Sequence, residues 1–132
     1  MNGNMKDIML FCSNTKVLYV EDNETARLHT MELLSRFFNN ITTAENGEEA
    51  LKLFHDNDID LIISDINMPK MGGIEMSEKI REIDQNITII LLSAHNETHF
   101  KNLASNVAGT VYLEKPLNLG KFIETLKSCI NK

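Results

Sequence analysis

Five side chains able to take part in chemistry stand at the ends of short apolar runs of this sequence. Glu21 and Asp22 follow the run VLYV, Asp65 follows LIIS, Ser93 follows TIILL, and Lys115 comes two residues after VYL. Clustered carboxylates raise one another's pKa unless a cation lies among them, and Mg²⁺ prefers such hard oxygen ligands. A metal ion, an ammonium group and a hydroxyl around one carboxylate would suit phosphoryl transfer to that carboxylate, and Asp65 is the central member.

The apolar runs alternate with stretches of helical periodicity. In the stretch 24–38, for example, Leu28, Met31, Leu33 or Leu34, and Phe38 recur with helical spacing. The patterns predict strands over 16–22, 41–44, 61–65, 87–94 and 111–113, and helices over 24–38, 47–54, 73–83, 97–107 and 119–130.

Five strands that alternate with helices are typical of the α/β class. We therefore predict a doubly wound, five-stranded parallel sheet with helices on both faces, as three α/β/α layers. In such a sheet the carboxyl ends of the strands share one edge, where ligands bind. The acids, the hydroxyl and the lysine are expected to converge at that edge.

Composition favours one globular domain over residues 16–132, preceded by a polar leader, 1–15, in which a small apolar patch indicates a short helix at the domain edge. The net charge is -6 and the 13 basic residues are scattered, which disfavours direct nucleic-acid binding. The patch is too short for a signal peptide or a membrane span, so a cytoplasmic protein is expected. Cys12 and Cys129 lack CxxC spacing and are expected to be reduced thiols.

Four motifs occur together in one order: Glu21-Asp22, the pattern DxxMPxMxG from Asp65, Ser93-Ala94, and Lys115-Pro116. With this combination the stretch 15–131 resembles the receiver domain of the response-regulator family, of the single-domain chemotaxis-regulator type. The resemblance implies a flavodoxin-like sheet with strand order 2-1-3-4-5. It also implies that Asp65 accepts a phosphoryl group.

The resemblance assigns further roles to this chain's residues. Mg²⁺ would be held by the side chains of Glu21, Asp22 and Asp65 and by the main-chain carbonyl of Asn67. Ser93 would supply the hydroxyl of the switch, and Ala94 would be the small residue that leaves room for it. Lys115 would be the charge partner of the phosphoryl group, and Tyr112 the aromatic residue that moves inward. Pro116 would be the proline after a cis peptide.

Two positions depart from the commonest family pattern, and others resemble positions that affect phosphoryl lifetime. Ser93 stands where threonine is commoner, which keeps the hydroxyl but loses the methyl that restricts its rotamer. Gly72 occupies a position often held by aspartate. Asn67 and His95, two residues beyond Asp65 and Ser93, resemble positions that tune phosphoryl lifetime, and we predict that His95→Ala changes the rate of autodephosphorylation. Identical decay rates in the variant and the wild type would contradict this.

The resemblance also implies partners. A sensor histidine kinase or a phosphotransfer protein would donate the phosphoryl group, and the face formed by 97–107, 111–113 and 119–130 would then change for a target that the sequence does not identify. No membrane contact is expected, and the chain would be a monomer or a phosphorylation-dependent dimer. It would be a switch with only self-phosphorylation and autodephosphorylation activity, not a metabolic enzyme.

The residues at these positions also bear on other functions. A flavodoxin-like redox protein is disfavoured because Glu21 and Asp22 would repel a flavin phosphate. A phosphatase with an aspartate nucleophile would need a second acid where Asn67 stands. The remaining alternative is that the chain is the receiver portion of a longer hybrid kinase, cyclase or transcription regulator.

Overall fold

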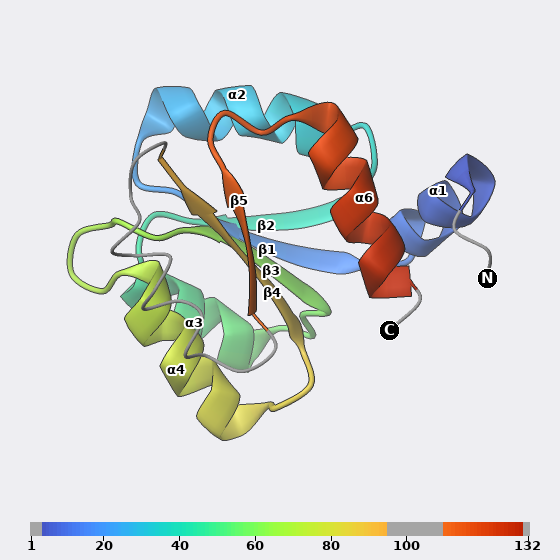
Figure 1. Cartoon of the computed structure of the whole chain (residues 1–132). Coiled ribbons are helices and arrows are strands. Elements are labelled where there is room, and N and C mark those ends of the chain that lie inside the picture. The colour runs from blue at the N-terminus through green and yellow to red at the C-terminus, as the bar shows by residue number, and fades with distance from the viewer. Residues whose placement is uncertain (1–3, 95–109, 131–132) are drawn as a thin grey trace.

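The computed structural model describes residues 4–94 and 110–130. Five parallel strands form one sheet in the order β2-β1-β3-β4-β5 (Figure 1). The strands are β1 (Lys16–Val20), β2 (Asn40–Ala44), β3 (Leu61–Asp65), β4 (Thr88–Ser93) and β5 (Thr110–Glu114). Both the predicted fold class and the predicted strand order are confirmed.

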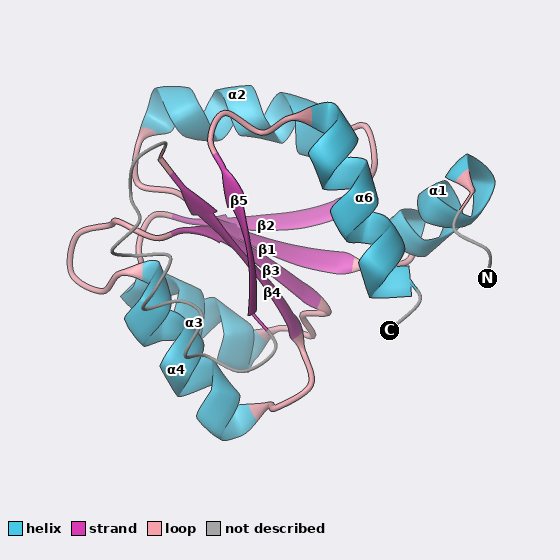
Figure 2. Ribbon diagram, in the orientation of Figure 1, coloured by secondary structure: helices cyan, strands magenta, loops and turns pink. Residues whose placement is uncertain are grey.

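Helices cover the two faces of the sheet, as Figure 2 shows. They are α1 (Met5–Ser13), α2 (Glu24–Leu34), α3 (Gly47–Asp56), α4 (Gly73–Ile83) and α6 (Leu119–Ile130). One apolar cluster joins α1, α2 and α6 to the sheet, and a second joins α3 and α4 to the opposite face. The helix predicted over 97–107 lies outside the described residues, as does His95.

The central strands are buried on both sides. All five residues of β3 are buried, and so are the last five residues of β4. This burial agrees with their continuous apolar sequence, because a strand covered by helices on both faces has no solvent-facing positions. The prediction for the first strand extended to Asp22, but β1 ends at Val20, where its pairing with β2 and β3 stops. The predicted ends of β2, β4 and β5 differ from the observed ends by one residue.

The prediction for the first long helix was wrong in two respects. Helix α2 ends at Leu34, because the next turn tightens to contacts of the i to i+3 type, such as Phe37 N to Leu34 O at 3.0 Å. Phe38 therefore lies in the loop after α2, and its side chain is buried. Leu28 is 64% exposed, since six residues from the buried Leu34 correspond to a rotation of about 120° away from it around the helix.

Helix α1 lies within the predicted leader and belongs to the hydrophobic core. Asn4 caps it by accepting from the amide of Asp7, and Ile8 and Cys12 are fully buried in the cluster that also contains Phe122 of α6. Neither Cys12 nor Cys129 forms a disulfide bond. The leader thus contributes one face of a helix to the same core as the sheet.

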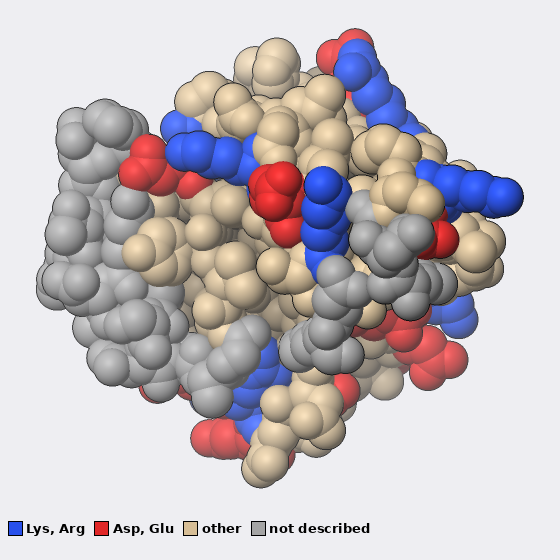
Figure 3. Space-filling view, turned by 45° about the vertical axis from the view of Figure 1, so that its right-hand side comes forward, with Lys and Arg blue, Asp and Glu red and all other residues tan. Residues whose placement is uncertain are grey.

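The described residues show how charge is distributed on one face and whether a helix could span a membrane. On the face drawn in Figure 3, Lys and Arg side chains are interspersed with Asp and Glu. None of the helices described is both long and apolar enough to cross a lipid bilayer.

Candidate functional site

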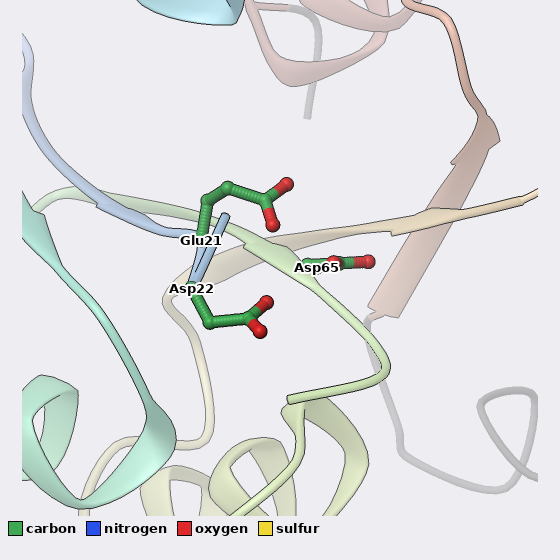
Figure 4. A group of neighbouring side chains, drawn as sticks. All are labelled: Glu21, Asp22 and Asp65. Atoms are coloured by element: carbon green, nitrogen blue, oxygen red, sulfur yellow. The ribbon is translucent and has the colours of Figure 1, made fainter. Parts of the chain in front are cut away.

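Three carboxylates meet where β1 and β3 end. Val20 of β1 pairs with Ser64 of β3 in the parallel register, so the next residues, Glu21 and Asp65, lie side by side at the ends of these two strands. Asp22 follows directly, and each of the three side chains offers an oxygen such that all three atoms lie within 4.8 Å of one another (Figure 4). Glu21 is 1% exposed and Asp65 8% exposed, so two of the carboxylates are removed from water.

The side chain of Lys115, the residue directly after β5, contacts two of these carboxylates. Its Nζ lies 2.7 Å from Glu21 Oε1 and 3.0 Å from Asp65 Oδ2. Its backbone amide donates to the carbonyl of Ser93 at 2.7 Å, which continues the sheet past the end of β5. The peptide between Lys115 and Pro116 is cis, as the resemblance implied. Lys115 therefore bridges two acids that come from different strands.

Burial and charge act against each other on these groups. Burial, together with the charge of Glu21, raises the pKa of Asp65 to about 6, although Lys115 opposes the shift. Burial also acts to raise the pKa of Glu21, but the hydrogen bond and charge of Lys115 outweigh it and the pKa is lowered. Burial acts to lower the pKa of Lys115, and its bonds to the two carboxylates outweigh this, so that pKa is raised.

The raised pKa of Asp65 makes the stability of the metal-free protein depend on pH. The stability that a neutral, buried Asp65 contributes is fully present below its ordinary pKa of 3.8 and is lost as pH rises through about 6. This shift already includes the opposing effect of Lys115 and corresponds to about 3 kcal/mol. We expect the free energy of unfolding of the metal-free Asp65→Asn variant to exceed that of the metal-free wild type by about 2 kcal/mol at pH 7 and by little at pH 4.

Urea unfolding followed by circular dichroism, with a chelator present, would measure this difference. The matched control is Asp58→Asn, whose side chain is 94% exposed and should show no such trend. A stability difference between wild type and Asp65→Asn that stays constant from pH 4 to pH 7 would contradict the prediction.

The predicted switch residues occupy distinct environments. Ser93 is fully buried at the end of β4, and its hydroxyl has no hydrogen-bond partner within the described part of the chain. Tyr112 on β5 is 39% exposed. Ala94 borders the cavity above the acids, and Asn67 lies exposed in the loop after β3.

A cavity of about 760 Å³ opens over the acids. Glu21, Asp22, Asp65 and Lys115 form its polar end, and side chains of α2 and of the segment after β5 form the rest. The donor set fits Mg²⁺, because three carboxylates from adjoining strand ends offer hard oxygen ligands and leave room for water. The bridging position of Lys115 is consistent with a cluster that requires positive charge.

The sequence did not predict a role for Arg27 of α2. Its Nη1 donates to the main-chain carbonyl of Glu21 at 2.8 Å. Contacts with a backbone carbonyl leave no residue pattern, and the only signal in the sequence is a basic residue six positions after the acid.

Comparisons with known proteins agree with this architecture. The sequence matches the response regulator receiver domain over residues 17–127. It is 33% identical over 128 residues to Histidine kinase P4 of Formosa agariphila, covering 96% of this chain and 9% of the kinase. It is 30% identical over 115 residues to Chemotaxis protein CheY of Halobacterium salinarum, covering 87% of this chain and 96% of that protein.

A solved structure shows the same likeness in three dimensions. The co-crystal structure of the Saccharomyces cerevisiae histidine phosphotransfer signaling protein Ypd1 and the receiver domain of its downstream response regulator Ssk1 matches with a TM-score of 0.77 and 26% identity, covering 90% of this chain and 92% of that chain. The chain spans between 9% and 44% of the length of four curated relatives that it matches. The match over residues 17–127 and the shared fold show that this chain belongs to the response regulator receiver domain family of two-component signalling.

Proposed function

We propose that the chain accepts a phosphoryl group on Asp65 in a Mg²⁺-dependent reaction and thereby switches a protein-binding face. The observation that supports this most directly is the pairing of Asp65 with Lys115 at 3.0 Å inside a cluster of three carboxylates. Such a site combines a nucleophilic carboxylate with the charge neutralisation that phosphoryl transfer needs.

The chemistry assigns one task to each group. Mg²⁺, held by Glu21, Asp22, Asp65 and the carbonyl of Asn67, would neutralise charge on the phosphoryl oxygens. An oxygen of Asp65 attacks phosphorus as the bond from phosphorus to the donor's imidazole nitrogen breaks, and the electron pair of that bond stays with the imidazole. Lys115, already beside Asp65, pairs with a phosphoryl oxygen.

The switch follows from the transferred group. The buried hydroxyl of Ser93 would donate to a phosphoryl oxygen, and Ala94 leaves it room. Tyr112, now 39% exposed, would move inward as Ser93 turns. Pro116 follows Lys115 through a cis peptide. The face containing β5 and α6 would change accordingly and bind a target or a second copy of the chain.

The relatives support the choice of phosphoryl donor. One is a histidine kinase, and one solved structure pairs a receiver domain with a histidine phosphotransfer protein. We propose that a sensor histidine kinase or a phosphotransfer protein serves this chain. The match to a small part of a kinase also supports the second candidate, that the chain is the receiver portion of a longer hybrid protein.

Intact-mass analysis after incubation with acetyl phosphate tests the proposal. We expect one added phosphoryl group on the wild type, dependent on Mg²⁺ and absent from Asp65→Ala. Asp58→Ala, which alters a 94% exposed carboxylate, should still gain the group. An adduct that persists in Asp65→Ala would rule out Asp65 as the acceptor.

A further inference from the structure

Arg27 contacts two segments that meet beside the acid cluster. Its Nη1 donates to the carbonyl oxygen of Glu21 at 2.8 Å, and its Nη2 lies 3.7 Å from Glu45 Oε1. The Arg27 side chain is 18% exposed and that of Glu45 is 65% exposed, so the bond to the Glu21 carbonyl is partly shielded from water and the ion pair with Glu45 is open to solvent. Glu45 belongs to the loop between β2 and α3, which contributes no residue to the proposed site.

The contact with Glu21 fixes the backbone that leads to Asp22. The carbonyl of Glu21 belongs to the peptide that joins these two acids, and the amide of Glu21 donates to the carbonyl of Ala44 at 3.0 Å. Both peptides that flank Glu21 are therefore held. Because a peptide is planar, holding this carbonyl also restricts the direction in which the chain and side chain of Asp22 continue.

The first residue of α3, directly after the loop between β2 and α3, touches the loop that follows β3. The amide of Gly47 donates to the carbonyl of Met71 at 2.9 Å, in the loop that follows β3 and contains Asn67. A Cβ at Gly47 would lie 2.7 Å from that same carbonyl oxygen, so the start of α3 and the loop after β3 are in direct backbone contact. The segment from Ala44 to Gly47 thus connects the backbone at Glu21 with the loop after Asp65.

We propose that Arg27 is a positioning residue for the cation site: with Glu45 it fixes the Glu21–Asp22 peptide against the loop between β2 and α3, and so sets the spacing of the carboxylates. This inference rests on the proposed function, because it assumes that these carboxylates bind Mg²⁺. Arg27 is not among the described side chains that line the cavity, so it acts through the backbone of the ligands.

Arginine suits this position for a geometric reason. Its planar guanidinium presents several N–H groups in fixed directions, so one side chain can bond a carbonyl and face a carboxylate at once. A lysine ammonium at the same place could reach one of the two acceptors but lacks the fixed fork. The residues that orient metal ligands commonly change metal affinity by about 10- to 100-fold when they are removed.

Isothermal titration of Mg²⁺ into the metal-free protein tests the proposal. We expect Arg27→Met to weaken Mg²⁺ binding about tenfold, with smaller losses for Arg27→Lys and Glu45→Gln. The matched control is Arg81→Met, because Arg81 also donates to a backbone carbonyl, that of Asp84 at 3.3 Å, but on α4 away from the acids. Arg81→Met should bind Mg²⁺ like the wild type.

A second measurement separates positioning from stability. Urea unfolding without Mg²⁺ gives the folded fraction of each variant, and the Mg²⁺ affinity is compared only for folded protein. If Arg27→Met does not fold, Arg27→Lys and Glu45→Gln provide the comparison. Under the proposal, raising Mg²⁺ to saturation restores the rate of phosphorylation by acetyl phosphate in the variants.

The outcomes are distinguishable. Wild-type Mg²⁺ affinity retained in folded Arg27→Met, or in both milder variants, would overturn the positioning role and leave the proposed function intact. Absence of Mg²⁺ binding by the wild type would instead overturn the metal site on which the proposed function depends. Weaker binding in Arg81→Met as well would show a general effect of lost arginine contacts and would also overturn the proposal.

Discussion

Replacing Lys115 with methionine is expected to lower the rate of Asp65 phosphorylation by acetyl phosphate by about 100- to 1,000-fold, the cost of removing one stabilising donor from a preorganised site. Lys115 lies 3.0 Å from Asp65 and 2.7 Å from Glu21, so its loss removes positive charge from both acids. Methionine retains most of the apolar stem but leaves these buried carboxylates without their ammonium partner.

This rate is measured at saturating Mg²⁺ by following the phosphorylated fraction of the protein over time with intact-mass analysis. Lys121→Met provides the control, because Lys121 is exposed on α6 and has no ion pair with the acids among the described residues. A Lys115→Met protein that is phosphorylated at the wild-type rate would exclude Lys115 from the reaction.

Replacing Ile8 with alanine is expected to reduce the free energy of unfolding by about 2–5 kcal/mol. Ile8 lies on α1, is fully buried and packs in the same cluster as Phe37 and Phe122, whose rings meet edge to face. Removing its outer carbons leaves a cavity that the surrounding helices cannot fully close. Chemical denaturation of the metal-free protein measures the change.

Leu10→Ala is the matched control for α1, since Leu10 is 55% exposed on the same helix. It should alter the free energy of unfolding by no more than about 0.5 kcal/mol. Equal effects of the two substitutions would mean that α1 does not contribute its buried face to folding.

The strands and the polar residues at their ends could be predicted because both have local signals. The runs before Glu21, Asp65 and Ser93 are continuously apolar, which a fully buried strand requires, and each ends at a polar residue. Parallel topology then places such ends at one edge of the sheet, so the proximity of Glu21 to Asp65 followed without any distance information.

Other features depend on contacts that no local pattern encodes. The end of α2 at Leu34 depends on a tightened turn, and Phe38 is buried although it lies outside the helix. The full burial of Ile8 requires that α6, more than a hundred residues later, packs against α1. Arg27 contacts a main-chain carbonyl, and every residue type has one.

The bridge formed by Lys115 means that the site contains its own tethered counter-ion. A covalently attached ammonium remains at the same local concentration however dilute the protein or the metal becomes, unlike ions drawn from solution. The buried acids Glu21 and Asp65 therefore never depend wholly on an external cation for compensation. An incoming divalent ion adds to positive charge that Lys115 already supplies to these two acids, and the same lysine is beside Asp65 when phosphate adds further negative charge.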